Sequence, residues 1–496
     1  MLSSNPFGRL TYVVVALVIS FSLVLIARGT TGMPTFHIPE SIWHPTWSEN
    51  ATDIIPDSKN ITDISYDLTT VPSVGCEDIV NDLQQRLIHA YSKRLKGIRY
   101  ANIWGYLETE NKGDAAIWSA QQMLLATLGI ETMEACRFMH KGCDVEKFTA
   151  RLEEHRPHSG IIMAGGGNFN DYYWEDQPSR MKMIRTYTNV SVRAFPQSIY
   201  MVKENRIEST RKSFVKHHDL QLAARDKPSH DWLVEQFGDV EGIETDLIPD
   251  IAFMWGNRSD FRTDTEKKWD LLILARKDGE IAEGDSEEIP FGTGYLNLGA
   301  IGNITYNKVD WKFTDTPGIN GPEGSEGAET AQNEFNKNKD KQSNKDKEAS
   351  TTTEASTTTK ASNDNEASET TGTSNPSETT GSSSSNDKRD DKEPEVEEQR
   401  ENGVNQRAWA KAVSGFELLG SARFVITDRL HGHIMSTVIG TPHVLMDSKL
   451  GKNLNFHNTW TRDCKCTRIT DNISDALDVA SRWFAENDAE GDEELY

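Results

Sequence analysis

The stretch FVITDRLHGHIMSTVIGTPHVL, residues 424–445, decides the fold because it sets a positively charged turn between two apolar segments. The β-favouring residues 424–427 predict a short buried parallel strand. Residues 428–432 then form the turn above this strand, and 433–439 begin the next helix. In open α/β sheets, ligands bind at this edge, where helix N-termini point toward them. The stretch therefore predicts a strand–turn–helix unit with a ligand-binding turn.

Two side chains of this turn suit an anionic ligand. Arg429 offers a planar fork of N–H donors for a phosphate or carboxylate group. His431 can donate a hydrogen bond or transfer a proton near neutral pH. This stretch alone leaves an alternative open, in which Arg429 pairs with Asp428 or another carboxylate and His431 caps the helix.

A long polar insert precedes this stretch. The chain has 496 residues, enough for two or three domains, but only 36% of them are hydrophobic. Residues 313–405 contain runs such as STTTEASTTTKASND, which offer almost no apolar side chains to bury. We therefore predict that this insert is disordered.

The negative charge lies mainly in two polar segments. Of the formal net charge of −24, residues 315–401 contribute −11 and the C-terminal residues 486–496 contribute −6. Only −7 is left for the rest of the chain. This distribution says little about the substrate, but it argues against a nucleic-acid partner.

The N-terminus indicates a membrane anchor. Residues 11–27, TYVVVALVISFSLVLIA, carry no charge and are just long enough to span a bilayer as a helix. A cleaved signal peptide is the alternative, but no small-x-small cleavage site precedes Arg28. We predict a single-pass type II signal anchor in the Golgi or another secretory-pathway membrane, with the catalytic part in the lumen.

Glycosylation motifs and cysteines agree with a luminal location. Six Asn-x-Ser/Thr motifs occur, at Asn50, Asn60, Asn189, Asn257, Asn303 and Asn472. In an oxidising compartment, at most two internal disulfides and one leftover thiol arise from the five cysteines, Cys76, Cys136, Cys143, Cys464 and Cys466. The pair Cys464 and Cys466 is spaced too closely for a structural zinc site and has no matching pair, so we predict no metal site.

Helical and strand-like patterns alternate along the rest of the chain. Helices are predicted at 80–95, 114–128, 228–237 and 406–419. Strands are predicted at 98–104, 161–164, 190–195, 220–223, 247–251, 271–275, 424–427 and 443–446. Such alternation predicts parallel βαβ units. The simplest arrangement is an α/β fold with two Rossmann-like domains facing a cleft.

The predicted organisation begins at the membrane and places the insert inside the second domain. In chain order it comprises a cytosolic tail (1–10), the signal-anchor transmembrane helix (11–27), a luminal stem (28–79), an N-terminal Rossmann-like domain (80–262), a C-terminal Rossmann-like domain (263–312 and 406–485) interrupted by the disordered low-complexity insert (313–405), and an acidic tail (486–496). Within the C-terminal Rossmann-like domain, only residues 294–311 are available to form additional strand–helix units before the insert.

Three loop motifs lie where predicted strands or helices meet. In the motif NKGD (111–114), Asn111 or Asp114 either faces a ligand or simply caps the following helix. The run 165–168, GGGN, exposes backbone N–H groups after a strand, as anion sites do, although a tight turn also uses glycine. In the motif ARD (224–226), Arg225 either contacts a ligand or forms a local ion pair with Asp226.

The order of the motifs is more informative than any one motif. Together they resemble the polysaccharide pyruvyltransferase family, in a eukaryotic, type II membrane-anchored form, over residues 98–460 without the insert. The motifs are NKGD (111–114), GGGN (165–168), FPQS (195–198), ARD (224–226), PDIAF (249–253), TDRLHG (427–432) and GTP (440–442).

The resemblance implies a GT-B-like fold and a reaction that transfers a pyruvyl group from phosphoenolpyruvate to a terminal sugar of a glycan, often galactose, as a pyruvate ketal. It implies no cofactor besides this donor substrate. It assigns donor binding to Arg225, Arg429, Leu430 and His431, and catalysis to His431, Arg429 and Arg225. Six residues are expected in loops around the cleft: Asn111, Asp114, Gly166, Gly167, Asn168 and Gln197. His217 and His218 are candidates only by proximity.

Two other functions stay open at this point. A GT-B glycosyltransferase that uses a nucleotide sugar shares the predicted architecture, but it gives the Arg-Leu-His turn no special role. A catalytically silent glycan-binding or scaffold protein is the other alternative, and the acidic insert favours it. The pyruvyltransferase interpretation explains the most motifs.

Overall fold

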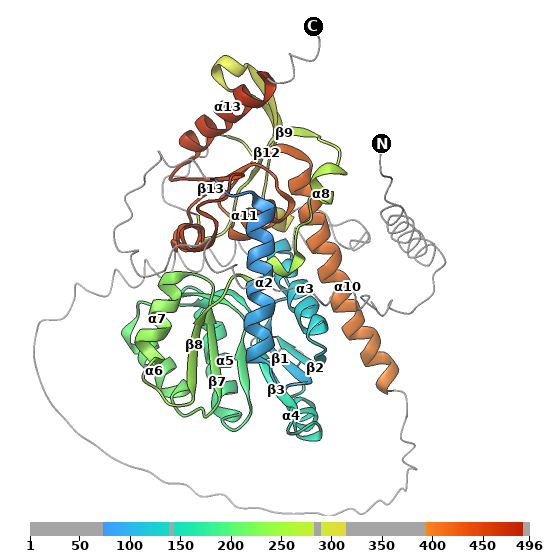
Figure 1. Cartoon of the computed structure of the whole chain (residues 1–496), viewed down its shortest axis with the longest axis vertical. Helices are drawn as coiled ribbons and strands as arrows, with labels where there is room; N and C mark the ends of the chain where they lie inside the picture. The colour runs from blue at the N-terminus through green and yellow to red at the C-terminus, as the bar shows by residue number, and fades with distance from the viewer. Residues whose placement is uncertain (1–72, 138–142, 282–288, 314–392, 490–496) are drawn as a thin grey trace, which may run out of the picture. The chain divides into compact units, whose positions relative to one another are not determined.

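Two largely parallel β-sheets organise the chain (Figure 1). The computed structural model describes residues 73–137, 143–281, 289–313 and 393–489, without the side chains of 313, 393–403 and 489. The sheets have eight and six strands. This confirms the predicted α/β class with parallel sheets.

Every pairing within the first sheet is parallel. The strand order is β2-β1-β3-β5-β7-β6-β4, with β8 beside β7. The strands are β1 (Tyr100–Tyr106), β2 (Glu131–Arg137), β3 (Ser159–Met163), β4 (Gly166–Asn170), β5 (Val192–Ala194), β6 (Gln197–Tyr200), β7 (Leu220–Ala224) and β8 (Ile243–Leu247). The helices are α2 (Cys76–Arg94), α3 (Lys112–Thr127), α4 (Val145–Glu154), α5 (Gln177–Thr186), α6 (Glu204–Phe214) and α7 (Lys227–Phe237), with a 3-10 turn η4 (Trp174–Asp176).

The second sheet has the order β10-β11-β9-β12-β13-β14 and is parallel except for the β10–β11 pair. Its strands are β9 (Trp269–Leu274), β10 (Gly292–Asn297), β11 (Asn303–Val309), β12 (Ala422–Thr427), β13 (His443–Met446) and β14 (Thr467–Thr470). The helices are α8 (Asp260–Thr263), α10 (Glu393–Gly420), α11 (Leu430–Ile439), α12 (Lys452–Phe456) and α13 (Ile473–Ala489). Shorter turns are η5 (Ile251–Trp255), η6 (Gly299–Ile301), η7 (Trp311–Phe313) and η8 (His457–Thr461).

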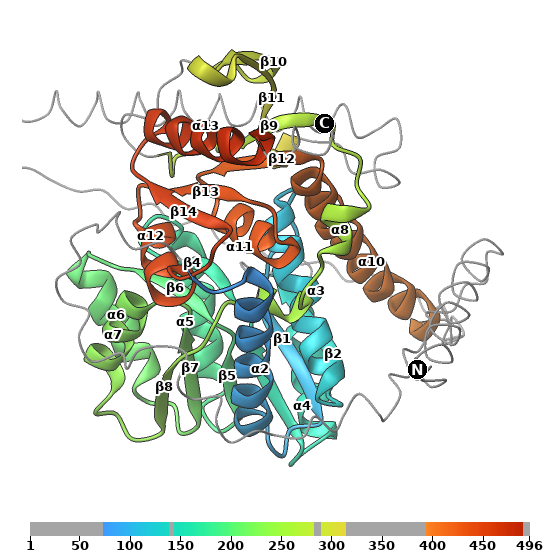
Figure 2. The ribbon, with the colours of Figure 1, turned by 45° about the horizontal axis from the view of Figure 1, so that its top comes forward.

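The central strands are buried on both faces, as a parallel sheet requires. All five residues of β3 and the last four of β12 are buried. Helix α13 covers one face of the second sheet (Figure 2). Its Ala480 and Phe484 belong to the same apolar cluster as Phe424 and Val444. The backbone pairing of β12 with β13 runs from Val425 to Thr427, next to the turn of the site described below.

One of the apolar clusters links the two sheets. Trp255 of η5 contacts Phe416 of α10, with ring centroids 4.9 Å apart, and Phe253 stacks with Phe456 of α12 at 6.2 Å. All described residues accordingly belong to one compact unit. The predicted cleft between two separate domains stays a prediction.

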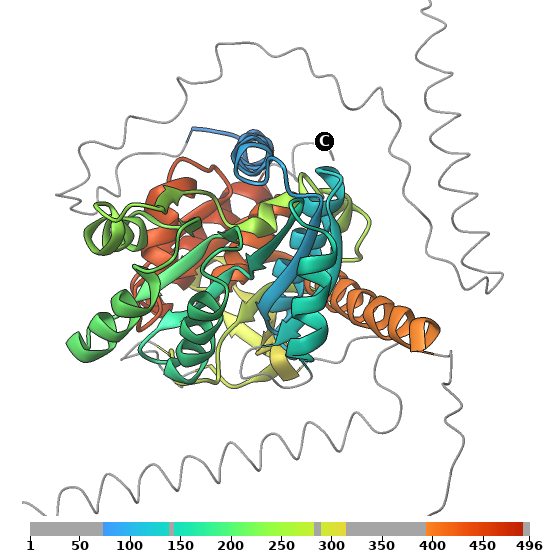
Figure 3. The same cartoon turned by 90° about the horizontal axis from the view of Figure 1, so that it is seen from below.

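Helix α10 begins earlier than predicted. It starts at Glu393, so the prediction of disorder is wrong for residues 393–405. Pro394 suits the first helical turn, and the Glu, Gln and Arg residues that follow favour a helix. Asn405 Oδ1 also accepts a hydrogen bond of 2.7 Å from Trp118 Nε1 of α3. The N-terminal end of α10 projects past the helices around the first sheet (Figure 3).

Other boundaries also differ from the prediction. The predicted strand 247–251 is wrong, because β8 ends at Leu247 and Ile251 starts the 3-10 turn η5. The run GGGN and the loop FPQS are not only loops, since β4 begins at Gly166 and β6 at Gln197. Helix α13 continues to Ala489, beyond the predicted start of the acidic tail at 486.

Several predictions fall outside the described residues. The cytosolic tail, the anchor at 11–27 and most of the stem precede residue 73, and most of the insert lies within 314–392. Among the helices that the structure describes, none has both the length and the hydropathy needed to cross a bilayer.

The cysteines form two groups. Cys136 pairs with Cys143, and Cys76 of α2 lies within bonding distance of both Cys464 and Cys466. One sulfur forms one disulfide, so one cysteine of this trio is left over, as the odd number of cysteines implies. The trio is also the one described group of sulfur, imidazole or carboxylate ligands close enough to hold a metal ion. The spacing of Cys464 and Cys466 gave no sign of Cys76 as their neighbour, because it is 388 residues from Cys464.

Candidate functional site

A buried ion pair lies at the carboxyl edge of the first sheet. Arg225 follows β7 and Asp250 follows the neighbouring strand β8. Arg225 Nη1 donates a 2.6 Å hydrogen bond to Asp250 Oδ2, and each side chain is 1% exposed. Arg225 Nε donates to Ser198 Oγ of β6 at 2.9 Å. Three parallel strands that end at one edge therefore fix the guanidinium.

His431 of the second sheet faces this ion pair. Its Nε2 lies 3.5 Å from Asp250 Oδ2. Burial raises the pKa of Asp250, but Arg225 and His431 lower it more, so that the pKa is held well below its usual range. Asp250 is therefore a carboxylate that contacts side chains from both sheets, Arg225 and His431.

The first turn of α11 positions the imidazole. Only Asp428 and Arg429 separate β12 from α11, so His431 lies within the helix and not in the loop that we predicted. Gly432 allows this tight approach, because a Cβ there would come within 2.5 Å of Thr427 Oγ1. Gly113 of α3 lies against the ring, and a Cβ at Gly113 would lie 2.8 Å from His431 Nδ1.

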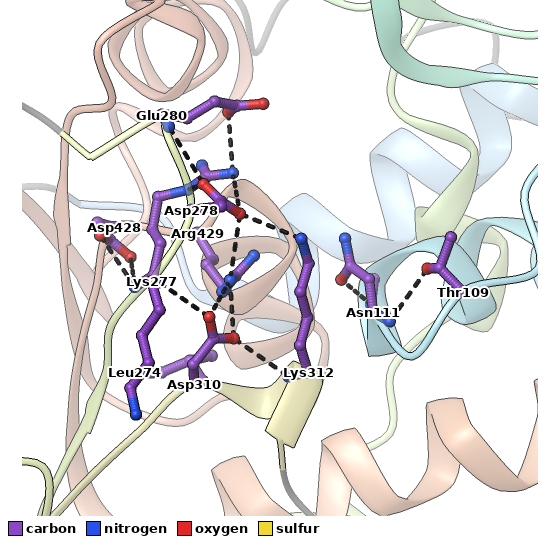
Figure 4. Close-up of polar contacts among 12 residues, drawn as sticks. Thr109, Asn111, Leu274, Lys277, Asp278, Glu280, Asp310, Lys312, Asp428 and Arg429 are labelled. Atoms are coloured by element: carbon purple, nitrogen blue, oxygen red, sulfur yellow. Dashed lines mark hydrogen bonds and ion pairs between the residues drawn. The ribbon is translucent and has the colours of Figure 1, made fainter. Parts of the chain in front are cut away.

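Arg429 points into a cluster of carboxylates (Figure 4). Its Nη2 lies 2.7 Å from both carboxylate oxygens of Asp310, which follows β11, and 3.5 Å from Asp278 Oδ2. The paired alternative for Arg429 is therefore correct, with Asp310 as the main partner. Arg429 Nε has no hydrogen-bond partner among the described residues.

The cluster continues as a chain of ion pairs along this edge. Arg276 Nε donates to Asp278 at 2.8 Å, and its Nη2 lies 2.9 Å from Glu280. Glu280 in turn pairs with Lys452, the first residue of α12. Lys312 lies 3.2 Å from Asp278 on the side that faces Asn111 (Figure 4).

Gly167 brings the cations of both sheets together. A Cβ at Gly167 would lie 2.9 Å from Arg225 Nη2 and 3.9 Å from Lys452 Nζ. Arg225 and Lys452 therefore converge over the start of β4. Trp460 of η8 adds a further link, because its Nε1 donates a 2.8 Å hydrogen bond to the backbone oxygen of Arg225.

The other predicted loop residues have local partners. Asn111 caps α3 by accepting from Gly113 N at 3.0 Å, and Asp114 accepts from Thr109 Oγ1 at 2.7 Å. Asn168 donates to Asp176 at 2.9 Å. Gln197 donates to Ala164 O at 2.7 Å. Gly166 has a φ of 133° at the start of β4, and Leu430 is buried in the shared core.

The two histidine candidates lie at the wrong edge of the sheet. His217 and His218 precede β7, whereas Arg225 follows its carboxyl end. His217 Nδ1 accepts from Asp219 N at 3.1 Å, and burial lowers its pKa to about 4. The structure does not bring these residues to the site.

Several residues of the site were not assigned a role from the sequence, among them Asp250 and Lys452. Asp250 stood in the PDIAF motif, but nothing in the motif showed that it joins Arg225 to His431. Lys452 carried no signal, because a lysine after the strand 443–446 is an ordinary surface residue by pattern. The interpretation of Arg225 as the partner of Asp226 is wrong, since Asp226 caps α7 by accepting from Ser229 N at 3.0 Å.

Sequence comparisons with known proteins agree on one family. The sequence model of the polysaccharide pyruvyl transferase family matches residues 78–295 and 370–449. Pyruvyl transferase 1 of Schizosaccharomyces pombe is 27% identical over 418 residues, which cover 83% of this chain and 82% of that protein. A solved structure of a functionally uncharacterised Klebsiella pneumoniae protein is 11% identical, with a TM-score of 0.41, and covers 78% of this chain and 98% of that one.

Proposed function

Because the chain belongs to the polysaccharide pyruvyl transferase family, we propose that it transfers a pyruvyl group from phosphoenolpyruvate to a terminal galactose of a glycan, forming a pyruvate ketal. Family membership identifies the protein as a transferase of pyruvyl groups to polysaccharide. The donor and the acceptor sugar are the proposed part. No cofactor is needed beyond the donor itself.

The observation that carries this proposal is the constellation of Arg225, Asp250 and His431. It combines an arginine that suits an anionic donor with a histidine that suits proton transfer, and both contact the same carboxylate. Asp250 stabilises a positive charge on the ring and orients it. A nucleotide-sugar transferase does not require such a histidine for its donor, so this geometry favours phosphoenolpyruvate.

The proposed reaction uses His431 as the acid. A proton from the imidazole adds to the methylene carbon of phosphoenolpyruvate and leaves an oxocarbenium ion at C2. A sugar hydroxyl adds to C2 and returns a proton to the imidazole. The bond from C2 to the phosphate oxygen then breaks, and a second hydroxyl of the same sugar closes the ketal and gives its proton to the departing phosphate. General acid catalysis of the first step contributes about 10²–10⁴-fold. Charge-assisted hydrogen bonds from Arg225 stabilise the departing phosphate.

Arg429 supplies the second anion contact in this proposal. Its Nη2 is occupied by Asp310, whereas the buried Nε has no partner among the described residues. Nε and its N–H are therefore free to take one oxygen of the donor carboxylate without breaking the pair with Asp310. The paired state and a donor-binding role of Arg429 are thus compatible.

The proposed location is a secretory-pathway membrane, with residues 11–27 as the anchor and the two sheets in the lumen. The exposure of two glycosylation-motif asparagines, Asn189 and Asn303, supports this orientation. Treatment of the cell-derived protein with an N-glycan-cleaving amidase should increase its electrophoretic mobility. No change in mobility would count against a luminal location.

The reaction is tested with the full chain, a galactoside acceptor and either phosphoenolpyruvate or UDP-galactose. Phosphate release with a matching gain in acceptor mass from phosphoenolpyruvate is the expected result. Turnover of UDP-galactose would instead indicate a glycosyltransferase, and turnover of neither would indicate a glycan-binding or scaffold protein.

The role of His431 is tested in the same assay. His431→Ala should abolish ketal formation and retain the fold. His218→Ala is the matched control, because His218 is exposed and lies at the opposite end of β7. Ketal formation at the normal rate by His431→Ala would remove His431 from the mechanism.

A further inference from the structure

We propose that Lys452 is a further donor-binding residue, which holds the phosphate group of the donor together with Arg225. This inference rests on the proposed function, since it names the group that the same site binds. Three features of the structure carry it: where Lys452 points, how it is held, and what its release leaves behind.

Lys452 points at the same place as Arg225. The two cationic groups reach Gly167 from different sheets, Lys452 from the start of α12 and Arg225 from the end of β7. Arg225 donates to Ser198 from Nε and to Asp250 from Nη1, and Nη2 is the guanidinium nitrogen that faces Gly167. Two cations that converge on one point suit a doubly charged anion.

Gly167 keeps its own side chain out of the way of these two cations. A Cβ at this position would press on Arg225 Nη2 and approach Lys452 Nζ. Its φ is not in the left-handed region, so the backbone itself does not require glycine here. A phosphate over this residue therefore meets the backbone, the guanidinium and the ammonium group together.

Glu280 pairs with Lys452 but also has other partners. The carboxylate of Glu280 also lies 2.9 Å from Arg276 Nη2 and accepts a 2.8 Å hydrogen bond from Tyr173 Oη. Glu280 is almost fully buried, yet it keeps two partners when Lys452 turns toward a ligand. The release of Lys452 thus avoids the cost of an unpaired buried carboxylate.

The electrostatics of Lys452 agree with a role in binding negative charge. The pKa of Lys452 is lowered to about 8, mainly by burial and also by Arg276 and Arg225, although Glu280 acts to raise it. A bound phosphate adds negative charge at this point and stabilises the protonated amine. The pair with Glu280 alone does not offset the burial of the ammonium group.

The test uses Lys452→Met in the full chain, with Lys449→Met as the matched control. Lys449 is exposed and lies three residues earlier. Inorganic phosphate and phosphoenolpyruvate are titrated into each variant, and binding is measured from the rise in unfolding temperature. We expect Lys452→Met to weaken both interactions about 10- to 100-fold, the range of one charge-assisted hydrogen bond. Lys449→Met should bind like the wild type.

A second pair of variants separates binding from folding. If Lys452→Met unfolds, Lys452→Gln keeps a polar side chain beside Glu280 and supplies a folded variant without the positive charge. This variant should still fail to bind phosphate, whereas Lys452→Arg should retain binding. Among active variants, the loss should raise KM for phosphoenolpyruvate and leave kcat within a few-fold.

The inference and the proposed function fail in different ways. Phosphate binding by a folded Lys452→Met variant at wild-type strength overturns the inference, whether or not phosphoenolpyruvate is turned over. A wild-type protein that binds no phosphate also overturns it. Wild-type protein that binds phosphate through Lys452 but forms no ketal would instead contradict the proposed reaction.

Discussion

Replacing Asp250 with asparagine should destabilise the protein and impair the site at once. The asparagine side chain keeps the shape of the aspartate and an oxygen that can accept the 2.8 Å hydrogen bond from Ala252 N. It removes the negative charge that both Arg225 and His431 face. The substitution therefore leaves the buried guanidinium of Arg225 without its negatively charged partner.

The burial of the pair sets the magnitude. Arg225 and Asp250 are each 1% exposed, and removing one partner of such a pair costs about 3–5 kcal/mol. Urea unfolding of Asp250→Asn measures the loss. Asp260→Asn is the matched control, because Asp260 pairs with Arg258 at 2.7 Å but is half-exposed, so its loss should be about 0–1 kcal/mol.

A double variant isolates the charge. Arg225→Met with Asp250→Asn removes both partners and should be more stable than Asp250→Asn alone, since no buried charge is left without a partner. Ketal formation should be lost in both. A loss of less than about 1 kcal/mol in Asp250→Asn, equal to that of the Asp260 control, would refute the assignment of a buried functional ion pair.

Two further predictions concern the edge of the first sheet and the core below α11. Gly167→Ala places a methyl group 2.9 Å from Arg225 Nη2. The KM for phosphoenolpyruvate should therefore rise, while the unfolding temperature changes little. Unchanged donor kinetics would contradict a binding site over this residue. Burial lowers the pKa of His443 to about 4 and that of His457 to about 3. The unfolded chain therefore binds more protons than the folded protein below pH 6.5. The free energy of unfolding should fall as the pH drops from 6.5 to 4, by about 3 kcal/mol for His443 alone. Urea unfolding at several pH values measures this slope, and His443→Gln should flatten it; a slope identical to the wild type would contradict the assignment.

The sheets were predictable because their strands repeat a strong local signal. Strand β13 has the predicted bounds, and β7 and β12 differ from theirs by one or two residues. Segments with weak patterns were missed or misplaced. Strand β8 is half-exposed and alternates polar residues, so the apolar residues after it drew the predicted strand toward 251.

The site was predictable only as separate loops. The turn after β12 and the Ala-Arg-Asp turn after β7 were identified, because charged residues at strand ends are visible in a single sequence. The carboxylates that pair with these arginines were not identified. Asp310 lies beside Arg429, and Asp250 beside Arg225, because of the order of the strands in each sheet. A sequence does not state which strands are neighbours, so the choice between a ligand and a carboxylate partner needed the fold.

The split of the site between two distant segments has a consequence for protein synthesis. Arg225 and Asp250 are made close together, whereas His431 follows roughly 180 residues later, a delay of about 10–35 s at ordinary elongation rates. During this interval the nascent chain holds the arginine and its carboxylate without the histidine. A ribosome-bound chain that stops within the insert should therefore hold only the part of the site that the first sheet supplies, and it should not catalyse.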